Sequence, residues 1–98
     1  MGEVRGNYRG TEGVRFVWNG CMSDPELLYD GKLFNYYDIE NALWDMFVEY
    51  MVEECGVSHD TIVEREQEFE DDFDRFVQDN CVNYLEDCIY GGYAYKTV

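Results

Sequence analysis

The sequence predicts an α+β fold, in which a small antiparallel sheet of three or four short strands packs against two or three helices, the last one long and acidic. Two observations carry this prediction. Short runs in which apolar and polar residues alternate, separated by turn-forming dipeptides, fill the first third of the chain. Apolar residues at helical spacing then recur through most of the remainder. A chain of 98 residues suits one modest core, so we expect a single domain over residues 1–98.

The composition combines many apolar residues with a large negative charge. Hydrophobic residues make up 46% of the chain and aromatic residues 17%, more than an intrinsically disordered acidic protein carries, so we expect it to fold. The 22 Asp and Glu against 7 Lys and Arg give a net charge of −15, which favours a partner with a positive surface. Nucleic acid and anionic membranes are disfavoured as direct ligands, because proteins bind the phosphates of both through Lys and Arg, and this chain has only seven of these residues.

The sheet is expected over residues 13–34, after a glycine-rich and mildly basic stretch, residues 1–12, that we interpret as a loose lead-in. The first strand has alternating apolar residues, and one of its faces is predicted to consist of Val14, Phe16 and Trp18. The dipeptide Asn19-Gly20 then favours a turn, because both residues tolerate positive φ.

A hairpin around Asp30-Gly31 is the strongest local signal in the chain. A type I′ turn needs positive φ at both central positions, and Asp-Gly is favoured there. The flanking runs Leu27–Tyr29 and Lys32–Phe34 are the expected strands. Residues 93–98 could add a terminal strand, since their aromatic and β-branched side chains have β-propensity.

A helix is expected over residues 36–55, with Asn35 as its N-cap and Gly56 as its stop. Its main apolar face is predicted to consist of Ile39, Leu43, Met46, Phe47 and Tyr50. Its acidic stripe consists of Asp38, Asp45, Glu49 and Glu53. An additional apolar edge is formed by Trp44, Val48 and Met51. This edge has two interpretations: packing between the sheet and the next helix, or contact with a partner or a second copy of the chain.

Residues 58–90 are expected to form an acidic helical segment, which Ser58 caps and Gly91-Gly92 ends. Its apolar side is predicted to consist of Phe69, Phe73, Phe76, Val77, Cys81, Tyr84 and Cys88. Glu66 would face this apolar side if the segment were one straight helix, so we expect a kink near residues 65–68. Nine of the residues from 60 to 79 are Asp or Glu, and most of them are predicted to face water.

Motifs for catalysis, metal binding or cofactor binding do not occur in the sequence. The single histidine, His59, lies four residues after Cys55 near a predicted helix end, which does not suit a Cys-His catalytic pair. Zinc-type spacing, a phosphate-binding glycine loop and a calcium-loop pattern are all missing. The cysteines have no paired-ligand spacing, and Cys81 and Cys88 are expected to be small buried residues in a reduced cytoplasm. We therefore expect no enzyme activity, cofactor or metal.

The acidic surface is the candidate functional feature. In a straight helix the nine carboxylates would be spaced about 3.3 Å apart along the axis, close to the ~3.4 Å between phosphates in one DNA strand. A row of this kind would fit a basic nucleic-acid-binding protein. The predicted contacts are Glu64, Glu68, Asp71, Asp72 and Asp79, with a second row formed by Asp45, Glu49 and Glu53. The simplest alternative is a solvated face that serves solubility or adaptation to high salt.

In length, charge, aromatic content and acidic-helix pattern, the region 38–87 resembles the small acidic inhibitors that phages and mobile elements use against host defence, the antirestriction and DNA-mimicking anti-CRISPR proteins. The resemblance rests on composition and pattern, and no alignable motif carries it. It implies a non-catalytic inhibitor that occupies the DNA-binding groove of a defence nuclease in the cytoplasm of an infected cell. The alternative is a protein–protein interaction module that binds through the apolar edge, without nucleic-acid mimicry.

Overall fold

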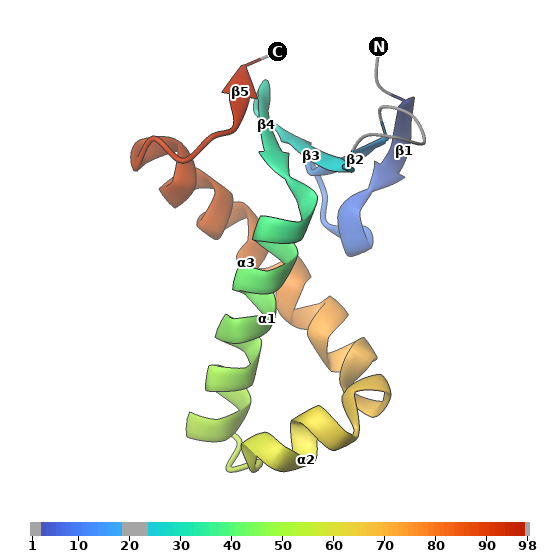
Figure 1. Cartoon of the computed structure of the whole chain (residues 1–98), viewed down its shortest axis with the longest axis vertical. Coiled ribbons are helices and arrows are strands. Elements are labelled where there is room, and N and C mark those ends of the chain that lie inside the picture. Colours follow the sequence, from blue (N-terminus) through green and yellow to red (C-terminus); the bar gives the residue numbers. More distant parts are fainter. Residues whose placement is uncertain (1–2, 19–23, 98) are drawn as a thin grey trace.

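The computed structural model describes residues 3–18 and 24–97, and over these residues the α+β prediction is confirmed (Figure 1). Five antiparallel strands form one sheet: β1 (Glu3–Asn7), β2 (Arg15–Trp18), β3 (Glu26–Tyr29), β4 (Lys32–Asn35) and β5 (Lys96–Thr97). The described helices are α1 (Tyr36–Glu53), α2 (His59–Glu64) and α3 (Glu70–Tyr90), with 3₁₀ turns η1 (Tyr8–Gly10) and η2 (Glu66–Phe69). The sheet lies at one end of the molecule, and α2 joins α1 to α3 at the other.

The strands follow one another in sequence order across the sheet. The predicted hairpin joins β3 to β4, and positive φ at Asp30 (49°) and Gly31 (71°) gives the type I′ geometry that the dipeptide favours. The expected terminal strand is also present as the short β5, which pairs with β4. Lys96 of β5 forms an ion pair with the buried Glu26 at 3.3 Å, which ties this end of the chain to the sheet.

The prediction of a loose lead-in is wrong for residues 3–12. These residues form β1, which pairs with β2, and η1, in which Tyr8 is only 3% exposed. Glycine content suggested irregular chain, but the glycines serve ordered structure: Gly6 has positive φ where the β1–β2 register shifts, and Gly10 has positive φ at the end of η1. The predicted turn Asn19-Gly20 and Cys21 lie outside the described residues.

The core lies between one face of the sheet, α1 and α3. Phe16, Leu27 and Phe34 are cross-strand neighbours on that face, and all three pack into the core. Aromatic rings join the helices, with Phe73 of α3 centred 5.4 Å from Phe47 of α1. Beyond this point α3 buries Val77, Cys81, Leu85 and Cys88. Both predicted cysteines are therefore buried, and burial raises the pKa of the Cys81 thiol to about 12.

Helix α1 begins as predicted, with the Asn35 side chain accepting a hydrogen bond from the Asp38 amide at 3.2 Å, and it ends at Glu53. The predicted apolar face is only partly correct. Met46 and Tyr50 are 38% and 46% exposed. Val48 and Met51, at 9% and 8% exposure, are buried instead. The additional apolar edge is thus largely internal, because α2 and α3 cover that side of the helix.

The predicted break in the acidic segment is confirmed. Ser58 caps α2 by accepting from the Thr61 amide at 3.2 Å. The helix ends at Glu64, and Arg65 has a non-helical backbone (φ −120°, ψ 35°). After η2, α3 returns toward the sheet in a new direction (Figure 1). Residues 58–90 therefore form two helices at an angle.

In the part of the chain that the structure describes, no helix combines the length and the apolar character that a membrane span requires.

Candidate polyanionic surface

The net charge of the chain resides almost entirely in its helical part. Residues 1–35 carry five acidic and four basic side chains, whereas residues 36–98 carry 17 acidic and three basic ones. Residues 1–35 form four of the five strands at the sheet end of the molecule (Figure 1), which is thus nearly neutral. The helices carry most of the negative charge.

The structure exposes all the predicted contact residues: Glu64, Glu68, Asp71, Asp72, Asp79, Asp45, Glu49 and Glu53. Within the described part of the chain, Glu68 is the only one of these eight residues that forms an ion pair. Its partner is the exposed Arg65, at 4.0 Å. Such a contact contributes little to stability, because water screens both charges. These carboxylates are therefore turned outward and remain open to a positively charged partner.

The carboxylates do not form the single straight row that the sequence suggested. On the described surface, Glu64 and Glu68 line a hollow of about 680 Å³ beside Trp44. Asp72 and Asp79 line a different hollow of about 520 Å³ between α1 and α3. A third hollow, of about 380 Å³, is lined by Asp45, Glu49 and Glu53. The expected spacing of one charge per 3.3 Å assumed a straight helix, and the break at Arg65 removes that condition.

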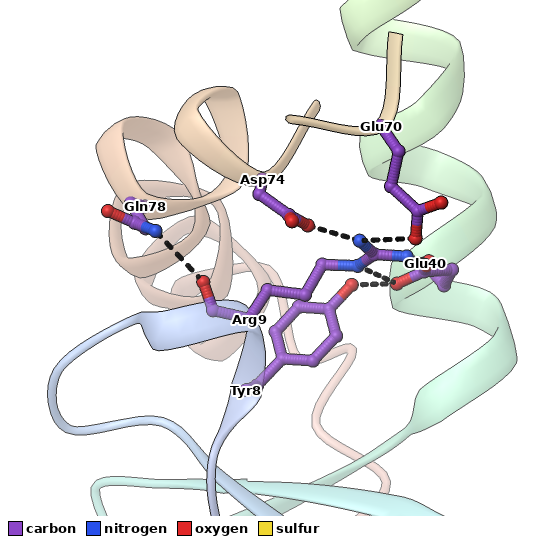
Figure 2. Close-up of polar contacts among 6 residues, drawn as sticks. All are labelled: Tyr8, Arg9, Glu40, Glu70, Asp74 and Gln78. Carbon is purple, nitrogen blue, oxygen red and sulfur yellow. Dashed lines mark hydrogen bonds and ion pairs between the residues drawn. The ribbon is translucent and has the colours of Figure 1, made fainter. Parts of the chain in front are cut away.

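A polar cluster around Arg9 was missed by sequence analysis (Figure 2). The Arg9 guanidinium donates a hydrogen bond from Nη2 to Glu40 Oε1 at 2.8 Å and is also ion-paired with Asp74. Its Nη1 lies 3.8 Å from Glu70 Oε1. The same guanidinium lies over the Phe73 ring, 4.7 Å from its centroid. One cation thus joins η1 to α1 and to the start of α3.

The turn η1 holds Arg9 in this position. Arg9 has a left-handed backbone (φ 45°, ψ 35°), and its carbonyl accepts a hydrogen bond from Gln78 Nε2 at 3.2 Å. The neighbouring Tyr8 hydroxyl donates to Glu40 Oε2. These contacts fix both ends of the arginine, its backbone on α3 and its head group between two helices.

Burial, together with the negative charges of Asp74 and Glu70, raises the pKa of Glu40 to about 7. The Glu40 side chain is 19% exposed, whereas Glu70 is 61% exposed. Desolvation therefore acts on Glu40 more strongly than on its exposed neighbour. We interpret this cluster as a structural link, because it fastens the sheet end to the helices.

The described residues contain no group of three or more His, Cys, Asp or Glu side chains arranged to hold a metal ion. His59 lines the third hollow, and Cys55 is exposed at the end of α1. Comparisons of the chain with protein-family models, with curated proteins and with solved structures found no match. The eight exposed carboxylates are arranged so that they can attract positive charge over an extended surface.

Proposed function

We propose that this protein is a non-catalytic inhibitor that mimics DNA and occupies the basic nucleic-acid-binding groove of a host defence nuclease, a CRISPR effector or a restriction enzyme. The observation that supports this proposal best is the outward orientation of all eight predicted carboxylates. A surface of this kind competes with a phosphate backbone for the same Lys and Arg residues.

The scaffold under the carboxylates favours binding. Asp72 and Asp79 are carried by α3, whose opposite side packs into the core through Phe73 and Val77. A helix held in this way presents its charges without having to become ordered on binding, which lowers the entropic cost of association. Charge complementarity would also accelerate association and make binding sensitive to salt.

The bend in the acidic segment determines which form of DNA the protein could imitate. Because α2 and α3 lie at an angle, the protein offers separate clusters of negative charge in place of one straight strand of phosphates. Such a shape suits a groove that bends its nucleic acid, or a pair of basic surfaces that meet at a corner. The partner remains a basic protein, and direct contact with nucleic acid or membrane is not part of the proposal.

DNA cleavage by purified restriction enzymes and CRISPR effectors, measured with and without the protein, tests the proposal. We expect inhibition that weakens as salt is raised. Replacing Asp71, Asp72 and Asp79 of α3 with Lys should weaken binding about 100-fold. A matched control replaces three exposed acidic residues outside the predicted contacts with Lys: Glu12, Asp24 and Asp87.

Both triple variants have the same net charge, so a difference between them reports position on the surface. Circular dichroism spectra that match the wild-type spectrum would show that both variants fold. Inhibition that is equally strong in the two variants would refute the proposed surface, and a failure of the wild-type protein to inhibit any nuclease would refute the function.

A further inference from the structure

A groove along α1, beside the start of α2, has an apolar floor and an acidic rim. The groove has a volume of about 380 Å³, and its floor consists of Trp44, Val48 and Val52. Its rim consists of Asp45, Glu49 and Glu53, and His59 of α2 also lines it. Within the described part of the chain, no Lys or Arg lines this groove.

Helical spacing explains how the floor and the rim come to lie together. Residues 44, 48 and 52 follow one another at intervals of four, and so do residues 45, 49 and 53. Residues four apart lie on the same side of an α-helix, one turn above the other. An apolar column therefore runs beside an acidic column over two turns of α1.

The floor of the groove is held in place by the core. The Trp44 ring is half-buried and packs against Phe73 and Phe47, with centroid distances of 5.1 and 5.4 Å. Val48 is buried, whereas Val52 is 39% exposed and available for contact. A ligand would therefore meet an indole and one valine, Val48, whose positions are already fixed by the core, which reduces the entropic cost of binding.

We propose that this groove binds an arginine side chain of the basic partner protein. The aliphatic stem would lie on Val48 and Val52, and the guanidinium would reach the carboxylates of the rim and the Trp44 indole. The inference rests on the proposed function and specifies the chemistry of its partner. It also joins the two alternatives that the sequence left open, since the acidic stripe and part of the apolar edge form one site.

Charge decides which occupant fits. An apolar segment would cover the carboxylates of the rim without neutralising them, which is costly. A second copy of the chain would bring like charges together. An arginine that contacts an aromatic ring and a carboxylate together already occurs in this chain: Arg9 lies over the Phe73 ring while it is paired with Glu40. Arginine fits better than lysine because a planar guanidinium both stacks on aromatic rings and binds carboxylates.

Binding of a fluorescently labelled deca-arginine peptide tests the proposal. The groove variant Glu49→Gln/Glu53→Gln removes two negative charges from the rim. The control variant Glu54→Gln/Asp60→Asn removes two exposed charges near the groove but outside its lining, and the two variants have equal net charge. We expect the groove variant to bind the peptide about tenfold more weakly than wild type, and the control to remain within about twofold.

Trp44 provides a second measurement. In a Trp18→Phe background Trp44 is the remaining tryptophan, so its emission should change when the peptide binds and should respond less in the groove variant. Equal weakening by the two double variants, or an unchanged Trp44 emission, overturns the groove as the arginine site. Either result leaves the polyanion mechanism standing if nuclease inhibition persists.

Two further outcomes separate the groove from the proposed function. Groove-specific peptide binding without inhibition of any nuclease would support the arginine site and refute the nuclease as the target. Peptide binding that resists high salt, and that Val52→Ser weakens while the groove variant does not, would overturn the inference in favour of an apolar ligand.

Discussion

Arg9 and Glu40 are 31 residues apart in the sequence, and their side chains meet at 2.8 Å in an ion pair that joins η1 to α1. Asp74 of α3 contacts the same guanidinium. This contact links the sheet end of the molecule, which is nearly neutral, to the helices that carry the charge.

Above about pH 7, where Glu40 is ionised, replacing Arg9 with Ala should lower the free energy of unfolding by about 2 kcal/mol, because the partly buried Glu40 and Asp74 lose their shared cation. Urea denaturation measures the change. Arg65→Ala is the matched control, since Arg65 is 64% exposed and has one ion pair, at 4.0 Å. The control should change stability by less than about 0.5 kcal/mol. Equal small effects of the two substitutions would contradict a structural role for Arg9.

Glu40 should make stability depend on pH. Its pKa rises from the ordinary value of 4.5 to about 7 in the folded protein, so the folded state holds a proton that the unfolded state has released. The stabilisation is therefore fully present below pH 4.5 and is lost as pH rises through about 7. Glu40→Gln cannot titrate, and its stability relative to wild type should increase across this window. Parallel pH profiles of the two proteins in urea denaturation would contradict the shift.

Gly10→Ala should destabilise the protein more than Gly13→Ala. Both glycines have positive φ, 78° and 85°, so each substitution costs about 1 kcal/mol of backbone strain. At Gly10 an added Cβ would also lie 2.9 Å from Gln78 Nε2, whereas at Gly13 nothing lies within 4 Å. Displacing Gln78 disturbs its hydrogen bond to Arg9, so we expect about 2 kcal/mol in total for Gly10→Ala. Thermal unfolding compares the two variants, and equal losses would show that Gln78 moves without cost.

Alkylation should distinguish the thiols of the folded protein. Burial raises the pKa of Cys81 to about 12, and Cys81 is fully covered, so iodoacetamide should leave it unmodified at pH 8. Cys55 is exposed and should react within the same time. Peptide mass mapping identifies the modified residues, and unfolding in urea should make Cys81 reactive. Rapid modification of Cys81 without denaturant would contradict the packing of α3.

Local signals predicted the parts of the fold that depend on neighbouring residues. The Asp30-Gly31 hairpin and the caps at Asn35 and Ser58 each depend on a few adjacent positions, and all three are present. The break near residues 65–68 was also predictable, because a straight helix would have turned Glu66 toward the apolar side.

Features that depend on distant contacts could not be read from the sequence. Arg9 lies on a glycine-rich stretch without an apolar pattern, and its partner Asp74 is 65 residues away. Helical periodicity placed Tyr50 and Met51 on adjoining sides of α1, but it could not show which side faces α2 and α3. The outward direction of the carboxylates was predictable from the same periodicity, whereas their separation into clusters depends on the angle at Arg65.

The non-helical backbone at Arg65 determines how this surface can be bound. A straight, evenly charged rod can slide along a complementary channel with little change in energy, so its position is poorly defined. An acidic segment that bends, as this one does at Arg65, fits a complementary bent channel in one position only. Under the proposed function, a partner that contacts carboxylates on both sides of Arg65 would hold the protein in a single register. Substitutions that straighten the chain there should then broaden the range of bound positions before they weaken attraction.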